Sequence, residues 1–124
     1  MATAESISRS YWKAEMARDL EKVMSYYRDD AVFEAPGVRL EGQEIRRFYE
    51  ESFKAFSKLE HEVRRVMGDD RLACLEWHAA LTDSSGRRRE FSGVNIAEVD
   101  GERFISVRAY FDRKDLDIAG ESSL

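Results

Sequence analysis

Cysteine, proline and long apolar runs are all scarce in this sequence of 124 residues. The one cysteine, Cys74, excludes an internal disulfide and a zinc site built from several cysteines. It lies in an apolar run, which favours a buried, unreactive thiol over a nucleophile. No apolar run approaches the roughly 18 residues of a membrane span, and the opening segment MATAESISRSYW lacks the apolar core of a signal peptide. We therefore expect a cytoplasmic protein with no membrane partner.

A surplus of positive charge is also missing. The 20 Lys and Arg residues are outnumbered by 25 Asp and Glu residues, and the two signs are interspersed along the chain. Nucleic acids are bound through clustered cations, so we expect no nucleic-acid partner. The chain has two histidines, and no set of ligand residues has the spacing of a metal site. We expect neither a metal nor another cofactor.

What is present has the composition of one globular domain. Hydrophobic residues make up 43% of the chain and charged residues 36%, and the length is close to the usual size of a domain. We therefore predict a single domain over residues 1–124. Residues from about 113 to 124 are expected to form a flexible tail, because the chain ends in small and polar residues.

The first half of the chain has the periodicity of helices. Helices are predicted over residues 4–18, 20–27 and 42–58, with Asp19 as the N-cap of the second. A short strand over 31–35 should end at the turn signal Pro36-Gly37. The third helix carries an apolar stripe at helical spacing, made of Ile45, Phe48, Tyr49, Phe53 and Phe56.

The second half has the period of strands. Strands are predicted over 61–67, 71–82, 88–99 and 103–112, and Asp100-Gly101 is a strong signal for a two-residue hairpin. Short turns between successive strands predict an antiparallel meander, and helices followed by strands are typical of the α+β class. Gly93, inside a strand, suggests a bulge or a bend that would curve the sheet. Helices on the concave side of such a sheet would enclose a hollow, which is a common site for a ligand.

The order of these elements, together with the segments ARDLEKVMSYYRDDAVFEAP, GVNIAEVDG and ISVRAYFD, resembles the NTF2-like superfamily, whose fold is a cystatin-like cone. The resemblance covers nearly the whole chain and is strongest to the SnoaL-like and ketosteroid-isomerase branches. It implies three helices packed on a strongly curved antiparallel sheet around a hydrophobic pocket. One scaffold of this kind carries many chemistries, so the reaction does not follow from the fold.

Ketosteroid isomerases use a general-base aspartate, while a tyrosine and a protonated aspartic acid bind the enolate oxygen. The resemblance places that tyrosine at Tyr11, eight residues before Asp19, and the protonated acid at Asn95. Tyr27 and Tyr49 match tyrosines that support the first one. A phenol and an amide are both hydrogen-bond donors, so we expect Tyr11 and Asn95 to bind a ligand oxygen.

The general base of the family falls on Ala35, which cannot move a proton. The best substitute is Glu15, one helical turn after Tyr11, because a carboxylate beside a dry pocket has its pKa raised toward the range useful for acid–base chemistry. The alternative is that Glu15 pairs with Arg18 or faces the solvent.

Strand alternation directs Trp77 into the interior and His78 to the convex side of the sheet. His78 is therefore a weaker candidate for a ligand-binding group or a base, and so is His61, which lies at the start of a predicted strand. The residues expected to bind the substrate are Tyr27, Phe33, Tyr49, Phe53, Trp77, Phe91 and Phe111.

The convex side should carry an unusual share of apolar residues. Cys74, Val94, Ile96 and Tyr110 alternate with polar neighbours there. A partly apolar surface on so small a protein favours an interface. Members of the superfamily commonly dimerise through this face, so we expect a homodimer.

Three functions remain open on the sequence. The first is an isomerase or lyase acting on a small apolar carbonyl compound, with Tyr11, Asn95 and Glu15 as catalytic residues. The second is a protein that binds such a ligand without converting it, and the third is a protein-interaction module whose interior is filled by Trp77, Phe53 and Phe111. Epoxide hydrolysis ranks low, because no inward-facing Asp-Arg-Asp set is evident.

Overall fold

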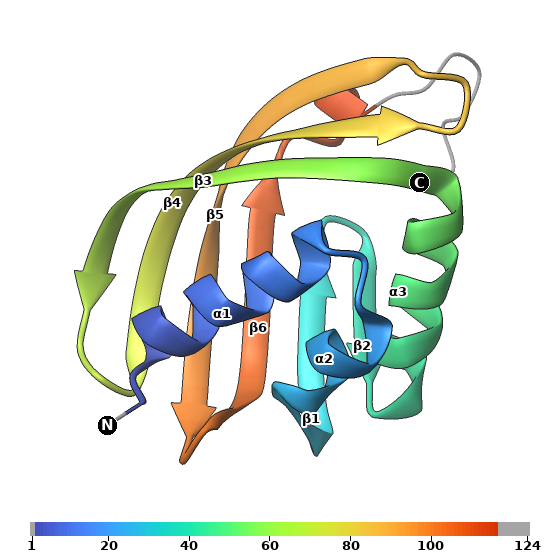
Figure 1. The fold of residues 1–124 in the computed structure, drawn as a ribbon. Coiled ribbons are helices and arrows are strands. Elements are labelled where there is room, and N and C mark those ends of the chain that lie inside the picture. The colour runs from blue at the N-terminus through green and yellow to red at the C-terminus, as the bar shows by residue number, and fades with distance from the viewer. Residues whose placement is uncertain (1, 117–124) are drawn as a thin grey trace.

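The computed structural model describes residues 2–116 and has the predicted α+β architecture, with helices covering one face of a curved sheet (Figure 1). The elements follow in the order α1 Ala4–Met16, α2 Leu20–Ser25, β1 Tyr27–Ala35, β2 Val38–Glu41, α3 Gln43–Ala55, β3 Phe56–Gly68, β4 Leu72–Asp83, β5 Arg88–Asp100, β6 Arg103–Phe111 and the 3₁₀ helix η1 Arg113–Leu116. The rest of the predicted C-terminal tail lies outside the described residues.

The first two helices begin at side-chain caps. Thr3 caps α1 in a reciprocal capping box with Ser6, and the Asp19 carboxylate accepts a 3.1 Å hydrogen bond from the Lys22 backbone at the start of α2. The N-cap predicted at Asp19 is thus confirmed. Helix α1 ends at Met16, two residues earlier than predicted, because Arg18 has a left-handed backbone with φ of 58°.

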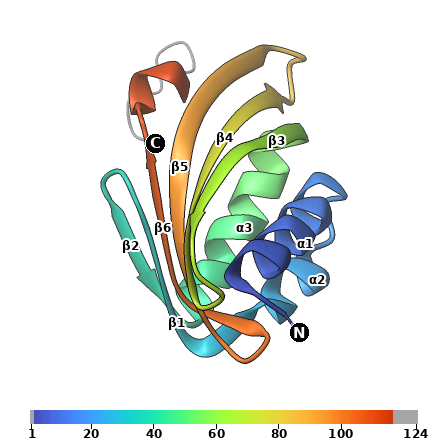
Figure 2. The same ribbon diagram turned by 90° about the vertical axis from the view of Figure 1, so that its left-hand side faces the viewer.

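The strands form one six-stranded sheet in the order β2-β1-β6-β5-β4-β3. Strands β3 to β6 make the predicted antiparallel meander, whereas β1 joins it in parallel beside β6. Figure 2 shows the sheet curving around the three helices on its concave side. This arrangement brings the helical first half of the chain over the interior of the sheet.

Several element boundaries differ from the prediction because strand pairing extends beyond the local signal. The hairpin at Pro36-Gly37 leads into β2, which was not predicted and pairs with β1. Strand β1 begins at Tyr27, opposite Phe104 of β6, although this residue was assigned to a helix. Likewise β3 begins at Phe56, opposite Asp83, so α3 ends earlier than expected.

Of the bulge or bend suggested at Gly93, the bulge is wrong, because the pairing of β5 with β4 continues through this residue without a shift and the pairing with β6 begins at it. Gly93 is needed for space instead. A Cβ atom there would lie 2.6 Å from Cζ2 of Trp77 and 2.5 Å from the backbone oxygen of Tyr110. The absence of a side chain lets the indole of Trp77 cross the strand. Register shifts occur elsewhere, within β3 and after Glu98 of β5.

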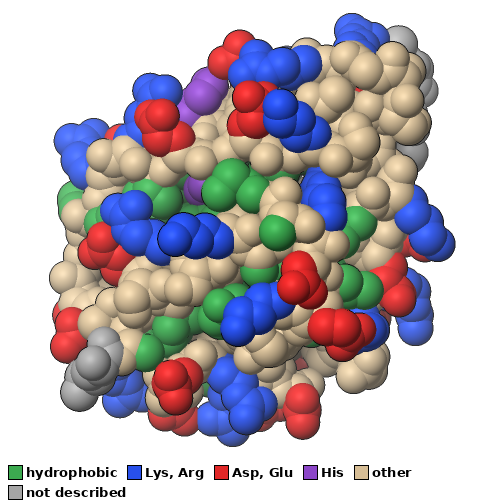
Figure 3. Space-filling model, in the orientation of Figure 1, with side chains coloured by type: hydrophobic (Ala, Val, Ile, Leu, Met, Phe, Trp, Pro, Cys, Tyr) green, Lys and Arg blue, Asp and Glu red, His purple; other side chains and the backbone are tan. Residues whose placement is uncertain are grey.

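The outer surface is mixed in charge. Figure 3 shows acidic and basic side chains interspersed with hydrophobic ones on the face that carries α1. On the convex side of the sheet, Met67, Leu72 and Tyr110 are large exposed hydrophobic residues. The homodimer expected through this side stays a prediction. Within residues 2–116 no helix has both the length and the apolar character needed to cross a membrane.

Candidate active site

A cavity of about 320 Å³ lies between the helices and the concave face of the sheet. Its wall is mostly apolar, and it is formed by α1, the β1–β2 hairpin, the C-terminal half of α3, strands β3 to β6 and η1. Since each water occupies about 30 Å³ in the liquid, the space corresponds to roughly ten waters. It is therefore large enough for a small organic molecule, at the lower end of the usual ligand-site range.

Three tyrosine hydroxyls from three different elements meet beside this cavity. The hydroxyl of Tyr49 on α3 is hydrogen bonded to that of Tyr11 on α1 and lies 2.8 Å from that of Tyr27 on β1. All three side chains are buried, and Phe104 packs against the rings of Tyr11 and Tyr27. The structure thus contains the chain of hydroxyls that was predicted, with Tyr49 in the middle.

The direction of the chain follows from counting protons. Either hydroxyl can be the donor in each contact, but the ionised Glu15 carboxylate can only accept, so Tyr11 is the donor of the hydrogen bond between those two. With the Tyr11 proton on that side, Tyr49 donates to Tyr11 and Tyr27 donates to Tyr49. Tyr11 keeps a proton that it can offer to a ligand, because it lines the cavity. Burial raises the pKa of all three phenols, so none loses its proton near neutral pH.

Glu15 lines the same cavity one turn after Tyr11 on α1. Burial raises the pKa of its carboxyl, while hydrogen bonding from Tyr11 and the positive charge of Arg18 partly lower it again. The alternative of an ion pair with Arg18 is not found among the described residues. The Arg18 guanidinium instead donates to the backbone oxygens of Phe56, at 2.7 Å, and of Glu15, at 3.2 Å.

Asn95 on β5 presents an oriented amide to the cavity. The indole N–H of Trp77 donates a 3.0 Å hydrogen bond to the Asn95 Oδ1 atom. Because an indole N–H is only a donor, this contact determines which end of the amide is oxygen. The Nδ2 group has no hydrogen-bond partner among residues 2–116, and Asn95 is 8% exposed and lines the cavity. An amide donor is therefore available to a ligand.

Ala35 also lines the cavity, so a methyl group stands where the resemblance would place a general base. The adjacent Glu34 does not replace it, because it lies 3.5 Å from Arg108 in an exposed ion pair on the other side of the sheet. Of the carboxylates at the cavity, Glu15 comes from α1, and Glu51 comes from an exposed position on α3.

The aromatic residues predicted to bind the substrate divide into two groups. Those that line the cavity are Phe33, Tyr49, Trp77, Phe91 and Phe111. Tyr27 and Phe53 are not among the residues that line it, and a role for them in binding a substrate stays a prediction. Tyr27 reaches the cavity only through its hydroxyl contact with Tyr49, and the ring of Phe53 is covered by the Arg18 guanidinium at 4.7 Å.

His61 makes more contacts in the candidate site than its position at the start of a predicted strand suggested. It lines the cavity, stacks on Trp12 with ring centroids 4.0 Å apart, and lies 5.4 Å from Trp77. Burial lowers the pKa of its imidazole to about 3, so the ring is neutral at ordinary pH. Its pairing with Ala79 in β4 determines that it faces inward, and that pairing is not a local property of the sequence.

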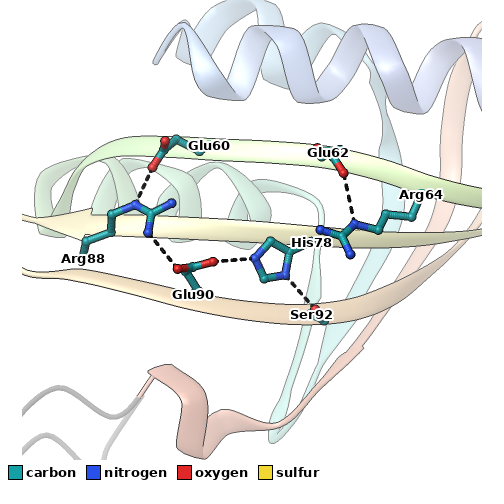
Figure 4. A network of polar contacts seen from close by, with 7 residues as sticks. All are labelled: Glu60, Glu62, Arg64, His78, Arg88, Glu90 and Ser92. Carbon is teal, nitrogen blue, oxygen red and sulfur yellow. Dashed lines mark hydrogen bonds and ion pairs between the residues drawn. The ribbon is translucent and has the colours of Figure 1, made fainter.

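His78 lies on the opposite side of the sheet, as predicted. Its ring nitrogens are 2.8 Å from Ser92 Oγ and 2.8 Å from Glu90, in a polar network that spans three strands (Figure 4). In the part of the chain that the structure describes, no group of three or more His, Cys, Asp or Glu side chains is placed to hold a metal ion.

Comparison with known proteins gives one family and many similar folds. An LEH-like epoxide hydrolase from M. tuberculosis superposes with a TM-score of 0.79 at 24% identity, covering 90% of this chain and 84% of that one. AclR, a candidate hydroxylase from Streptomyces galilaeus, superposes with a TM-score of 0.78 at 16% identity, covering 91% of this chain and 77% of AclR. An NTF2-like protein of unknown function from Burkholderia pseudomallei superposes with a TM-score of 0.82 at 15% identity, covering 94% of this chain and 95% of that protein.

These identities are low enough that the similar structures establish the fold alone. No curated protein matches the chain. The family described as the SnoaL-like domain matches residues 8–107, which include most of the helices and strands described above. The chain is therefore a member of the SnoaL-like domain family, with the NTF2-like fold.

Proposed function

We propose that the protein binds a small apolar carbonyl compound in the cavity and acts on it as an isomerase or lyase. The observation that carries this proposal is the pair of oriented donors at an apolar wall. Tyr11 is polarised by the chain from Tyr27 and Tyr49, and Asn95 is held by Trp77. Such preorganised donors stabilise negative charge on a ligand oxygen, because they need no reorientation when the charge develops.

Glu15 would move the proton in this reaction. Glu15 lies at the cavity wall, and burial raises the pKa of its carboxyl. Glu51, which also lines the cavity, is exposed to solvent on α3. A base whose pKa is closer to the working pH takes up and returns a proton more efficiently. Its position on α1 differs from that of Ala35 on β1, so the proton would be abstracted from a different side of the ligand than the resemblance implies.

The test is turnover of a β,γ-unsaturated ketone, followed by the absorbance of the conjugated product. Glu15→Gln is expected to lower kcat by at least 100-fold through loss of proton transfer. Tyr11→Phe is expected to lower it by about 100-fold through loss of one oxyanion donor. Tyr110→Phe is the matched control, because Tyr110 is 52% exposed on the convex side and should leave kcat unchanged. Full activity in both cavity variants would contradict the assigned roles.

The second candidate is a binding protein without catalysis, and the methyl group of Ala35 at the cavity wall favours it. Tight binding of a phenol that resembles the enolate, with no turnover of the enone at high protein concentration, would select this function. The interaction-module hypothesis receives less support, because a space of about 320 Å³ remains beside Trp77 and Phe111.

A further inference from the structure

Tyr11 has one proton to offer, and two groups compete for it. When Tyr11 donates to the Glu15 carboxylate, the Tyr27 and Tyr49 protons are used within the chain of hydroxyls and the Tyr11 proton is directed away from it. One possible acceptor is the Glu15 carboxylate, since both side chains lie on one face of α1 and both line the cavity. The other is the oxygen of a bound ligand.

Whether this competition lowers the affinity of the protein for a ligand depends on the chemical group that the ligand presents to Tyr11 and Glu15. A phenol or an enol brings its own proton, so it accepts from Tyr11 and donates to ionised Glu15 at the same time. A carboxylate brings no proton and adds a second negative charge to the space that holds Glu15. Tyr11 and Asn95 can donate to it, but ionised Glu15 repels its charge until Glu15 takes up a proton from the solvent.

We propose that Glu15 makes this cavity selective for phenols and enols, including the enol form of a carbonyl compound, over carboxylates of the same shape. The inference rests on the proposed function in one respect, namely that the ligand oxygen lies against Tyr11. It assigns Glu15 a role in choosing the ligand that is separate from any role in moving a proton during a reaction.

The other charged or titratable groups at the cavity do not supply the missing proton. The Tyr49 proton is used within the chain, His61 is neutral and has no hydrogen bond to a described residue, and Asn95 carries no charge. Glu51 lines the cavity from α3 but is exposed to solvent. Arg113 lines it from η1, where its guanidinium lies against Gly37 of the β1–β2 turn, and it offers charge but no transferable proton. Arg18 is engaged with the backbone oxygens of Phe56 and Glu15.

The experiment compares 2-naphthol with 2-naphthoate, which share a ring system and differ in the group that would face Tyr11. Binding of each is measured by calorimetry between pH 5 and 8. We expect the affinity for 2-naphthol to be constant, and the affinity for 2-naphthoate to fall about tenfold per pH unit above the pKa of Glu15. In Glu15→Gln the fall should disappear, and 2-naphthoate should gain at least tenfold at pH 8.

Glu98→Gln is the matched control, because it removes one negative charge from an exposed site on β5. It should reproduce the selectivity of the natural protein. The inference is wrong if Glu15→Gln keeps the preference for 2-naphthol, or if Glu98→Gln abolishes it to the same extent.

A second measurement needs no ligand and separates this inference from the proposed function. The Glu15 carboxyl is titrated by carbon NMR in the natural protein and in Tyr11→Phe. Loss of the Tyr11 donor should raise the pKa of Glu15, and an unchanged value would overturn the inference. If neither naphthalene compound binds while the pKa of Glu15 does rise, the proposed ligand class fails but the competition for the Tyr11 proton stands.

Discussion

The two faces of the sheet carry polar networks of opposite character. On the concave side, the hydroxyls of Tyr11, Tyr27 and Tyr49 form a neutral chain buried among aromatic rings. On the convex side, Arg88 joins Glu60 and Glu90 at 2.8 and 2.9 Å in the network of Figure 4, with side chains that are roughly half exposed.

The two networks differ in what can interact with a polar group after its hydrogen-bond or ion-pair partner has been removed. On the convex side water solvates each charge, so the ion pairs contribute little to stability. On the concave side the Tyr27 hydroxyl is enclosed by the rings of Tyr11, Tyr49 and Phe104, so it stays unsatisfied when it loses its partner. The buried network therefore constrains its members to one arrangement, which is what a binding site for a ligand oxygen requires. Four predictions test this contrast.

The largest effect is expected for Phe104→Ala. Phe104 is 1% exposed, and its ring lies 5.6 Å from that of Tyr11 and 5.2 Å from that of Tyr27. Removing it leaves a cavity under the hydroxyl chain and should lower the free energy of unfolding by about 3–5 kcal/mol. Urea denaturation measures this loss. Tyr110→Ala on the convex side should cost less than about 1 kcal/mol, and similar losses for the two variants would contradict the contrast.

Tyr49→Phe should have the next largest effect, because it removes the hydroxyl that both other tyrosines contact. The variant keeps the ring but leaves the Tyr27 hydroxyl without its partner, at a cost of about 1–3 kcal/mol in the free energy of unfolding. Tyr110→Phe serves as the control and should change it by less than about 0.5 kcal/mol. Equal stabilities of the two variants would show that the buried hydroxyls are solvated.

The third prediction concerns pH. The pKa of His61 is about 3 in the folded protein, below the usual histidine value of 6.5, so between these values the unfolded chain binds more protons. Stability should therefore fall as the pH is lowered from about 6.5 toward 3, with a contribution from His61 of at most about 1.4 kcal/mol per pH unit. Chemical denaturation of the natural protein and of His61→Phe at several pH values isolates this contribution. Parallel pH profiles would mean that His61 is solvated.

The smallest effect is expected for Arg88→Ala in the convex network. Its ion pairs with Glu60 and Glu90 are exposed, so the free energy of unfolding should fall by at most about 1 kcal/mol. The difference from the natural protein should shrink further in 1 M salt, where exposed charges are screened. The loss of unfolding free energy caused by Tyr49→Phe should not depend on the salt concentration. If the losses in both variants changed equally with salt, the proposed difference between the two networks would be wrong.

Local patterns in the sequence account for much of the fold. Helical periodicity predicted α1 and α3, Asp19 marked the start of α2, and hairpin signals such as Asp100-Gly101 predicted the meander of β3 to β6. The same patterns missed β2 and the first residues of β1 and β3, because these segments are strands only through pairing with distant partners. Local propensity contains no information on such partners.

The candidate site residues came from a resemblance together with local spacing. That resemblance named Tyr11, Tyr27, Tyr49 and Asn95, and helical spacing added Glu15. It did not reveal that Trp77 orients the Asn95 amide, since these residues meet through the pairing of β4 with β5. Nor did it place Phe53 under the Arg18 guanidinium, away from the cavity.

By itself, the sequence determined the class of fold, the order of the three helices and of the strands in the meander, and the single face of α1 that carries Tyr11 and Glu15. These properties depend on residues close together in the chain, whose spacing is a direct consequence of helix and strand geometry. Only the tertiary structure decided that Tyr27 and Tyr49 join Tyr11 in one chain of hydroxyls, and that His61 faces inward between Trp12 and Trp77. Those contacts join residues far apart in the chain, and the Tyr11–Tyr49 contact alone spans 38 positions. They therefore follow from how the curved sheet closes around the helices.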